Sequence, residues 1–275
     1  SIESISRGEG IMKKRLLSAI LLTGALLAAC GNDKDIATTD ANNNEDAEKI
    51  VIGTGSQFIN ICFYDEDGNL TGYDIELLKE IDQRLPQYEF DFEVMDFSNL
   101  LLSLETKKID VIAHNMAKNP EREEKFLFNS QPYNAVPTHV VVNEKNTDIQ
   151  SIDDLNGKTV GLAPTSNAAL FVEDYVAKND MDTKLTYITS TPDMLNQLKT
   201  DRIQAIFQFP FSVDIFNRES DAQLKLVGEP LIFSEIYFML NKQDEQLAAD
   251  IDEILVELID DGTVKELSEK WLGAD

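Results

Sequence analysis

The chain has 275 residues, of which 50 are acidic and 24 are basic, and its formal net charge is −26. A charge of this sign repels phosphate backbones and anionic lipid headgroups, which argues against nucleic acid as a partner. The two cysteines, Cys30 and Cys62, are too few for a disulfide framework, and Cys62 is expected to be a small core residue.

An export signal is predicted near the start of the chain. Met12 is followed by three cations, an apolar run from Leu16 to Leu27, and two alanines before Cys30. Secretion signals have this order of a cationic start, a short apolar stretch and small residues, whereas a transmembrane helix needs about 20 apolar residues. With cysteine after the small pair, the segment resembles a bacterial lipoprotein signal, which implies lipid modification of Cys30. Residues 1–29, eleven upstream residues and then the signal, are expected to be absent from the folded protein.

A polar tether is expected between the lipid and the folded part. Residues 30–48 hold Cys30 and then almost only small, polar and charged residues, which cannot bury a core and so predict disorder. The residues from Lys49 onward are enough for one large domain or two lobes of about 100 residues each.

Short apolar runs alternate with helix-period stretches along the first part of this folded chain. Asp74 is placed to cap the first helix, and Pro86 follows the end of that helix. The predicted elements are strands over 49–54, 88–94 and 109–113, helices over 74–85 and 98–106, and a hairpin turn at 65–68.

The second part repeats the alternation, which is typical of α/β proteins. Its predicted strands are 139–142, 158–162, 185–188, 204–207 and 224–227, and its predicted helices are 168–176, 192–198, 245–259 and 265–271. The helix over 245–259 stops at Gly262. It places five apolar residues on one face, namely Leu247, Ile251, Ile254, Leu255 and Leu258.

Common catalytic and metal-binding motifs are missing. The only two histidines, His114 and His139, have no metal-ligand partner at a usable spacing. The segment that starts at Gly53 begins like a dinucleotide fingerprint, but Phe58 stands where the last glycine belongs. We therefore expect no enzyme activity, no cofactor and no metal.

The segment around Arg122 has the features of a carboxylate receptor. A predicted strand ends at Ala113, its polar continuation offers backbone N–H groups, and Arg122 follows an Asn-Pro pair that starts a helical turn. A planar guanidinium group matches two carboxylate oxygens at once. On these residues alone, a solvated surface arginine is the alternative.

Short motifs in a shared order resemble the bacterial extracellular solute-binding proteins of the polar amino-acid type, family 3. The resemblance runs from about Ile50 to Gly273 and includes Gly72-Tyr-Asp-Ile-Glu76, Pro120-Glu-Arg122 and Ser268-Glu-Lys-Trp-Leu-Gly273. It implies an α/β, two-lobed periplasmic-binding-protein-like fold of type II, in which each lobe is a mixed sheet flanked by helices. The implied lobes are residues 49–134 plus 233–275 and residues 135–232.

Members of this family are capture subunits of ABC importers. The resemblance implies a monomer, anchored by lipid to the outer face of a Gram-positive cell membrane, that closes on a polar amino acid and delivers it to a permease and its ATPase. The segment around His114 and Arg122 is most similar to cystine-binding lipoproteins, so L-cystine is the first expected ligand, with other polar or sulfur-containing amino acids open. A ligand-sensing module for a signalling receptor is an alternative, and an enzyme on the same fold is a third.

The resemblance also implies which residues hold the ligand carboxylate. Arg122 would bind it, helped by the backbone N–H groups of Ala117 and Asn167. Ser166 and Asn167 lie where the chain enters a predicted helix, whose dipole favours an anion.

The remaining implied site residues are aromatic or neutral. Phe58 matches an aromatic that lies over the ligand, Phe97 matches a pocket wall, and Asn115 matches a position that contacts the α-ammonium group. Phe209 stands where many relatives have an aspartate for that ammonium. Three alternatives could replace the missing carboxylate. They are cation–π contact with the ring of Phe58 or Phe209, the carboxylate of Asp214, or Asn115.

Overall fold

The computed structural model describes residues 46–273. The predicted signal, the predicted lipidation site and most of the predicted tether lie outside this range. The described part is an α/β fold, as the sequence predicts. Its largest sheet has seven strands in the order β11–β8–β12–β6–β1–β5, with β7 also paired to β12. Every helix within the described range falls short of the length and apolarity that a bilayer-crossing segment requires.

Three parallel strands form one end of this sheet. They are β1 (Glu48–Thr54), β5 (Tyr88–Val94) and β6 (Val111–Ala117), with β1 in the middle. Helices α1 (Tyr73–Arg84) and α7 (Glu245–Asp260) share one buried cluster with these strands, and α2 (Phe97–Glu105) shares another. Helices on both faces explain why β6 is almost continuously buried rather than alternating. The predicted apolar face of α7 is confirmed, because all five of its residues are buried.

A small sheet extends this β1–β6 region beside the end of β1. It consists of β2 (Gln57–Phe58), β3 (Cys62–Tyr64) and β4 (Leu70–Thr71). The predicted hairpin turn lies between β3 and β4, where Gly68 N donates to Asp65 O at 3.0 Å. Cys62 is fully buried, as expected. The last helix, α8 (Thr263–Leu272), fixes the β2–β3 turn, because Asn60 Nδ2 donates to Trp271 O at 2.8 Å.

A second region is built around three short strands, β9 (Thr159–Leu162), β10 (Lys184–Tyr187) and β11 (Ile206–Gln208). A short 3-10 helix, η1 (Ile152–Leu155), precedes it. Helices α4 (Asn167–Lys178), α5 (Thr191–Lys199) and α6 (Pro210–Ser220) belong to this β9–β11 region. Its two buried clusters draw only on residues between Val140 and Val227, so this region has cores of its own.

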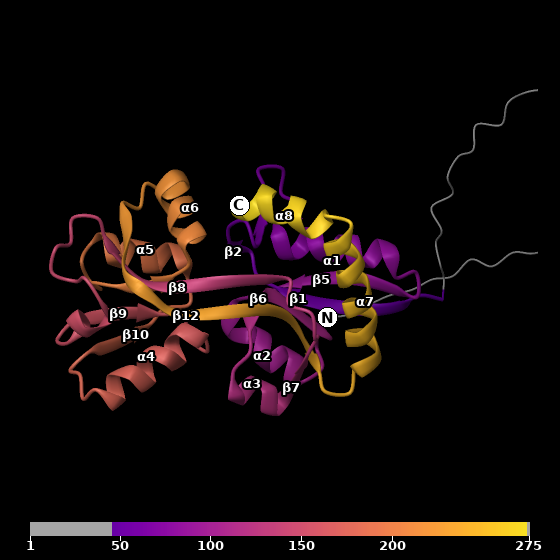
Figure 1. Ribbon diagram of the computed structural model, residues 1–275, viewed down its shortest axis with the longest axis horizontal. Helices are drawn as coiled ribbons and strands as arrows, with labels where there is room; N and C mark the ends of the chain where they lie inside the picture. The colour runs from indigo at the N-terminus through magenta and orange to yellow at the C-terminus, as the bar shows by residue number, and fades with distance from the viewer. Residues whose placement is uncertain (1–45, 274–275) are drawn as a thin grey trace, which may run out of the picture. The chain divides into compact units, whose positions relative to one another are not determined.

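Two long antiparallel strands connect the two regions (Figure 1). β8 (Asn134–Asn143) and β12 (Leu224–Asn241) pair with each other, with an irregularity between Val227 and Ile232. The far part of β12 then pairs with β6 and with β7 (Phe126–Phe128), which follows α3 (Pro120–Lys125). The crossovers therefore join β11 of the second region to the strands of the first region in one hydrogen-bonded sheet, whereas β9 and β10 pair in a separate two-stranded sheet.

Strands β2, β3, β4 and β7 were not predicted, and other features also differ from the sequence-based expectation. Asp74 is not the helix cap: α1 begins at Tyr73 after Gly72, and the Asp74 carboxylate is buried instead against Asn115 and Tyr133. Helix α6 was not predicted, because it starts at Phe209 and Pro210 without a side-chain cap. Strand β12 continues far beyond the predicted residues 224–227, because its pairing partners β8, β6 and β7 are distant in sequence.

Candidate functional site

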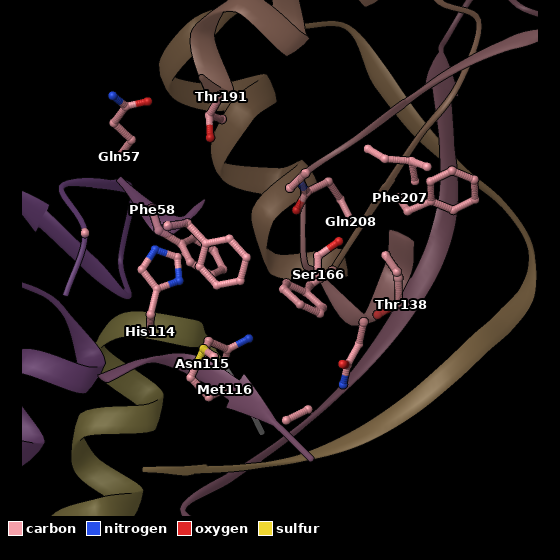
Figure 2. A pocket seen from close by; sticks show the side chains of 18 of the residues that line it. Gln57, Phe58, His114, Asn115, Met116, Thr138, Ser166, Thr191, Phe207 and Gln208 are labelled. Atoms are coloured by element: carbon pink, nitrogen blue, oxygen red, sulfur yellow. The ribbon is translucent and has the colours of Figure 1, made fainter. Parts of the chain in front are cut away.

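All eight residues expected to contact a ligand line one pocket, shown in Figure 2. They are Phe58, Phe97, Asn115, Ala117, Arg122, Ser166, Asn167 and Phe209. The pocket lies where β1, β5 and β6 end and where α4, α5 and α6 begin, and strands β8 and β12 also contribute to its wall. In α/β sheets, ligands bind at the carboxyl ends of parallel strands, so the topology itself places a binding site here.

Arg122 is held in this pocket by its own short helix. Asn119 caps α3, and its side chain accepts a hydrogen bond from Arg122 N at 2.8 Å. The Arg122 residue is only 4% exposed, and burial lowers the pKa of its guanidinium to about 10. It is therefore still a cation at neutral pH, and no salt bridge within the described residues involves it.

The guanidinium of Arg122 has an N–H donor that no hydrogen bond within the described residues uses. Nη1 donates to Ala117 O at 2.7 Å and Nη2 donates to Thr165 O at 2.8 Å, which fixes the orientation of the planar group. Nε is buried and has no hydrogen-bond partner among the described residues. A buried donor without an acceptor costs free energy, so its place in a pocket indicates a ligand that accepts. A carboxylate fits best, because it can accept two guanidinium N–H groups together.

The start of α4 faces the same place. Ser166 caps the helix, with its Oγ accepting from Ala169 N at 3.1 Å, and Asn167 is the first helical residue. Its backbone N–H lacks an acceptor within the helix, and the positive end of the helix dipole favours an anion. Thr165 reaches this turn with φ of 63°, an uncommon conformation for a β-branched residue. The turn therefore aims both the Thr165 carbonyl and the helix end at Arg122.

Aromatic rings form one wall of the pocket. Phe58 stacks on Phe209 and on Phe211, each at 6.1 Å between ring centroids, and these two rings stack on each other at 5.6 Å. Phe58 belongs to the β1–β6 region, and Phe209 belongs to the β9–β11 region, directly before α6. Their faces carry negative quadrupole charge, which attracts an ammonium group.

Asn115 presents a buried acceptor beside these rings. It has φ of 51°, and its backbone N–H donates to Asp74 Oδ2 at 2.6 Å. The residue is 9% exposed, and its Oδ1 is buried without a hydrogen-bond partner among the described residues. Asp214, in contrast, is an exposed residue of α6 and does not line the pocket. Of the alternatives for the α-ammonium group, the geometry favours Asn115 with Phe58 and Phe209 over Asp214.

His114 lines the pocket, although it was not among the residues expected there. Its ring lies 4.8 Å from Phe97 and 5.4 Å from Phe58, and a side chain on Gly55 would collide with its Nε2. Burial lowers the pKa of His114 to about 4, so the ring is neutral at physiological pH. Neighbours in a regular strand point to opposite faces. The left-handed backbone at Asn115 breaks this rule, so both side chains reach the pocket.

Side chains from the crossover strands were also missed. Thr138, Ser234 and Ile236 line the pocket from β8 and β12, and Gln208 lines it from the end of β11. No motif marks them, because their positions follow from how the two long strands pass between the regions. Only their alternation along a strand could have indicated which face they share.

Comparisons with known proteins agree with this geometry. The chain matches the family model of the bacterial extracellular solute-binding proteins, family 3, over residues 50–274. It is 45% identical to the L-cystine-binding protein TcyJ of Bacillus subtilis (strain 168), over 96% of this chain and 97% of that protein. It is 47% identical to TcyK, an L-cystine-binding protein of the same organism, over 91% and 92%.

A solved structure from Listeria monocytogenes, provisionally named an L-cystine ABC transporter, superposes with a TM-score of 0.81. It is 49% identical and covers 83% of this chain and 98% of its own. An ancestral arginine-binding protein bound to arginine has a TM-score of 0.75 at 29% identity, over 82% of this chain and 99% of its own. The same architecture is therefore seen in amino-acid-binding proteins of different specificity.

Proposed function

Because the chain belongs to the bacterial extracellular solute-binding proteins of family 3, we propose that it captures L-cystine for an ABC importer. The family supports amino-acid capture for import rather than catalysis. The choice of cystine rests on the two Bacillus subtilis proteins, which bind L-cystine and match nearly the whole of this chain. One observation carries the binding model: the buried Arg122, with an unpartnered Nε, lines the pocket.

In this proposal, Arg122 and the start of α4 receive one α-carboxylate of the ligand. The backbone N–H of Asn167 adds a donor, the backbone N–H of Ala117 is a further candidate, and Ser166 holds the helix end in place. The α-ammonium group lies against Asn115 Oδ1 and the faces of Phe58 and Phe209, while Phe97 closes the wall. A zwitterion is thus recognised by a positively charged guanidinium at its carboxylate and by neutral acceptors at its ammonium group.

The binding site contains residues of both regions of the two-lobed fold. In this proposal, a ligand bound between the lobes favours their closure. We place the lobes at residues 49–134 plus 233–275 and at residues 135–232, because the buried clusters separate near these limits. A ligand that contacts Arg122 and α4 together binds a closed arrangement better than an open one. It therefore shifts the equilibrium between the two by its differential affinity, and the permease with its ATPase would take the ligand from the closed form.

Location is the remaining part of the proposal. A lipid on Cys30, with residues 1–29 removed, would hold a monomer at the outer face of the membrane through the tether of residues 30–48. The extracellular family and the Bacillus subtilis relatives support this placement, which fits a Gram-positive cell.

Replacement of Arg122 by alanine tests the binding model. Truncation of one partner of a buried charged pair costs about 2–5 kcal/mol, so Arg122→Ala should weaken L-cystine binding about 30-fold or more, since each 1.4 kcal/mol is about a factor of ten. Isothermal titration calorimetry gives the dissociation constant, and circular dichroism checks the fold. Arg218→Ala is the matched control, because Arg218 is exposed on α6 outside the pocket. An Arg122→Ala protein that is folded and binds as well as the wild type would refute the model.

A further inference from the structure

The pocket contains a single carboxylate, and the binding model above does not use it. Among the residues that line the pocket, Asp96 is the only acidic one and Arg122 is the only arginine or lysine. Asp96 is exposed and follows β5 by two residues, directly before Phe97. One pocket therefore offers one buried cation and one solvent-facing anion.

The Asp96 carboxylate is free of any structural task in the described part of the chain. It occupies the N-cap position of α2, yet its side chain makes no capping hydrogen bond. An N-cap aspartate that caps its helix stabilises it by about 1 kcal/mol, and this one leaves that contribution unused. No salt bridge or side-chain hydrogen bond within residues 46–273 involves Asp96. The carboxylate can therefore bind a ligand without breaking an existing contact.

Strand register sets the distance between Asp96 and the proposed ammonium site. β1 pairs with β5 up to Thr54 and Val94, and with β6 at Gly53 and Ile112. If the first register is continued by two residues, Asp96 lies opposite Ser56. If the second is continued by three residues, Asn115 lies opposite Ser56 on its other side. Two local contacts support the continuation, since Met95 N donates to Thr54 O at 2.9 Å and Thr54 Oγ1 donates to Ala113 O at 2.7 Å. Adjacent strands lie about 4.8 Å apart, so this extended register gives an expected separation of about 10 Å between the backbones at Asn115 and Asp96.

L-Cystine has the length to span this separation. Its two α-carbons are joined through a disulfide, and in proteins such α-carbons lie about 4.4–6.8 Å apart. Each amino nitrogen lies about 1.5 Å from its α-carbon, so the two ammonium groups can reach a separation of about 9–10 Å. With one of them at Asn115, the other can lie beside the β5 end of the pocket.

We propose that Asp96 binds the second ammonium group of L-cystine and so selects a ligand with two amino-acid heads. This inference rests on the proposed function. The pocket also suits the disulfide that joins the two heads, because Met95, Phe97 and His114 line it with thioether and ring surface. His114 adds no repulsion to a second ammonium group, because burial lowers its pKa to about 4 and leaves it neutral.

Three ligands separate the contribution of each head. L-Cystine has both heads complete, the mixed disulfide of L-cysteine with cysteamine lacks the second carboxylate, and the mixed disulfide with 3-mercaptopropionate lacks the second ammonium group. Asp96→Asn keeps the size and helix-capping ability of the side chain but removes its charge. Calorimetry should show L-cystine and the cysteamine disulfide bound about 3- to 10-fold more weakly by Asp96→Asn, a small factor because the site is exposed. The 3-mercaptopropionate disulfide should bind equally well to both proteins.

Controls keep this inference separate from the proposed function. Asp214→Asn removes an exposed carboxylate outside the pocket and should leave all three affinities unchanged, and equal melting temperatures verify that both variants fold. If the wild type binds L-cystine and Arg122→Ala does not, but Asp96→Asn treats all three ligands like the wild type, only the role of Asp96 is wrong. If Asp96→Asn weakens all three ligands equally, Asp96 does not read the second ammonium group and the inference fails. If the wild type binds no L-cystine, the proposed function itself is overturned.

Discussion

Asp74 is a buried residue that holds a pocket residue, Asn115, in place. Its carboxylate is fully buried, and Oδ2 accepts hydrogen bonds from Asn115 N and from Tyr133 Oη at 3.0 Å. The first bond holds Asn115 in its left-handed conformation, and the second fixes Tyr133 directly before the crossover strand β8. The motif residue that the sequence suggested as a helix cap is thus a support for the proposed ammonium site.

The titration of Asp74 gives a prediction for stability against pH. Burial raises its pKa to about 7, whereas an unfolded aspartate has a pKa of about 3.9. The native state therefore binds this proton more tightly, so the stability that Asp74 contributes is present at low pH and is lost as the pH rises from about 4 to 7. Asn at this position cannot ionise. The melting temperature of Asp74→Asn relative to wild type should therefore increase from pH 5 to pH 8, by on the order of 5 °C.

Differential scanning fluorimetry across this pH range measures the effect. Asp214→Asn, an exposed aspartate, is the reference for the loss of a carboxylate without burial. A difference between Asp74→Asn and wild type that stays constant from pH 5 to pH 8 would contradict a raised pKa for Asp74.

At the scale of elements, helix starts and strand ends build the site. Helices α4, α5 and α6 begin at the pocket, and the parallel strands of the β1–β6 region end there. Ser166 caps α4 and Ser190 caps α5, and both helices line the pocket, α5 through Thr191 and Met194. Of the two capping serines, only Ser166 lines the pocket itself, so this pair compares a cap at the pocket wall with a cap one residue behind it.

Replacement of each cap by alanine should give different results. Loss of a serine cap costs about 0.5–2 kcal/mol, so Ser166→Ala and Ser190→Ala should each lower the free energy of unfolding in urea. The bond from Asp193 N to Ser190 Oγ is long, at 3.4 Å, so the Ser190 effect should be the smaller. Ser166→Ala should also weaken L-cystine binding several-fold, and more than Ser190→Ala does, because Ser166 lines the pocket and fixes the α4 end beside Arg122. Equal losses of affinity in both variants would argue against a role for the α4 start in binding.

At the scale of the whole described molecule, hydrogen bonds at the pocket join the two regions. Besides Arg122 to Thr165, Asn119 Nδ2 donates to Asn167 Oδ1 at 2.6 Å, and Asn167 Nδ2 donates to Lys118 O at 3.1 Å. These contacts connect residues before and within α3 to Thr165, which precedes α4, and to Asn167, the first residue of α4. They stabilise the arrangement in which a ligand can contact both sides.

Removal of the Asn167 side chain should make closure less favourable. Asn167→Ala keeps the backbone N–H proposed for the carboxylate. It removes both hydrogen bonds that the Asn167 side-chain amide makes between the regions. Since a smaller closed population lowers the apparent affinity in proportion, L-cystine should bind about 3- to 10-fold more weakly, as calorimetry can measure. Asn179→Ala is the matched control, because Asn179 follows the other end of α4 and its side chain bonds only to Tyr175 O. Wild-type affinity in Asn167→Ala would show that these bonds do not contribute to closure.

Local patterns predicted most of the fold. The apolar run of β1, the alternation of β5 and the apolar face of α7 depend on neighbours in the chain, so their positions could be read from the sequence within a few residues. The same holds for Arg122, because the Asn-Pro pair before it predicts a helical turn. The length of β12 was not predictable, because its pairing partners are distant in sequence, and α6 was not predicted, because no side-chain cap marks its start.

The sequence by itself determined the α/β class, the family and the eight residues that share the pocket, because these depend on local periodicity and on motifs in a fixed order. Only the tertiary structure decided that Asp74 supports Asn115, that His114 is a neutral part of the wall, and that Asp96 lies about two strands from Asn115. The physical reason is that burial, strand register and hydrogen-bond partners are set by contacts between residues far apart in the chain.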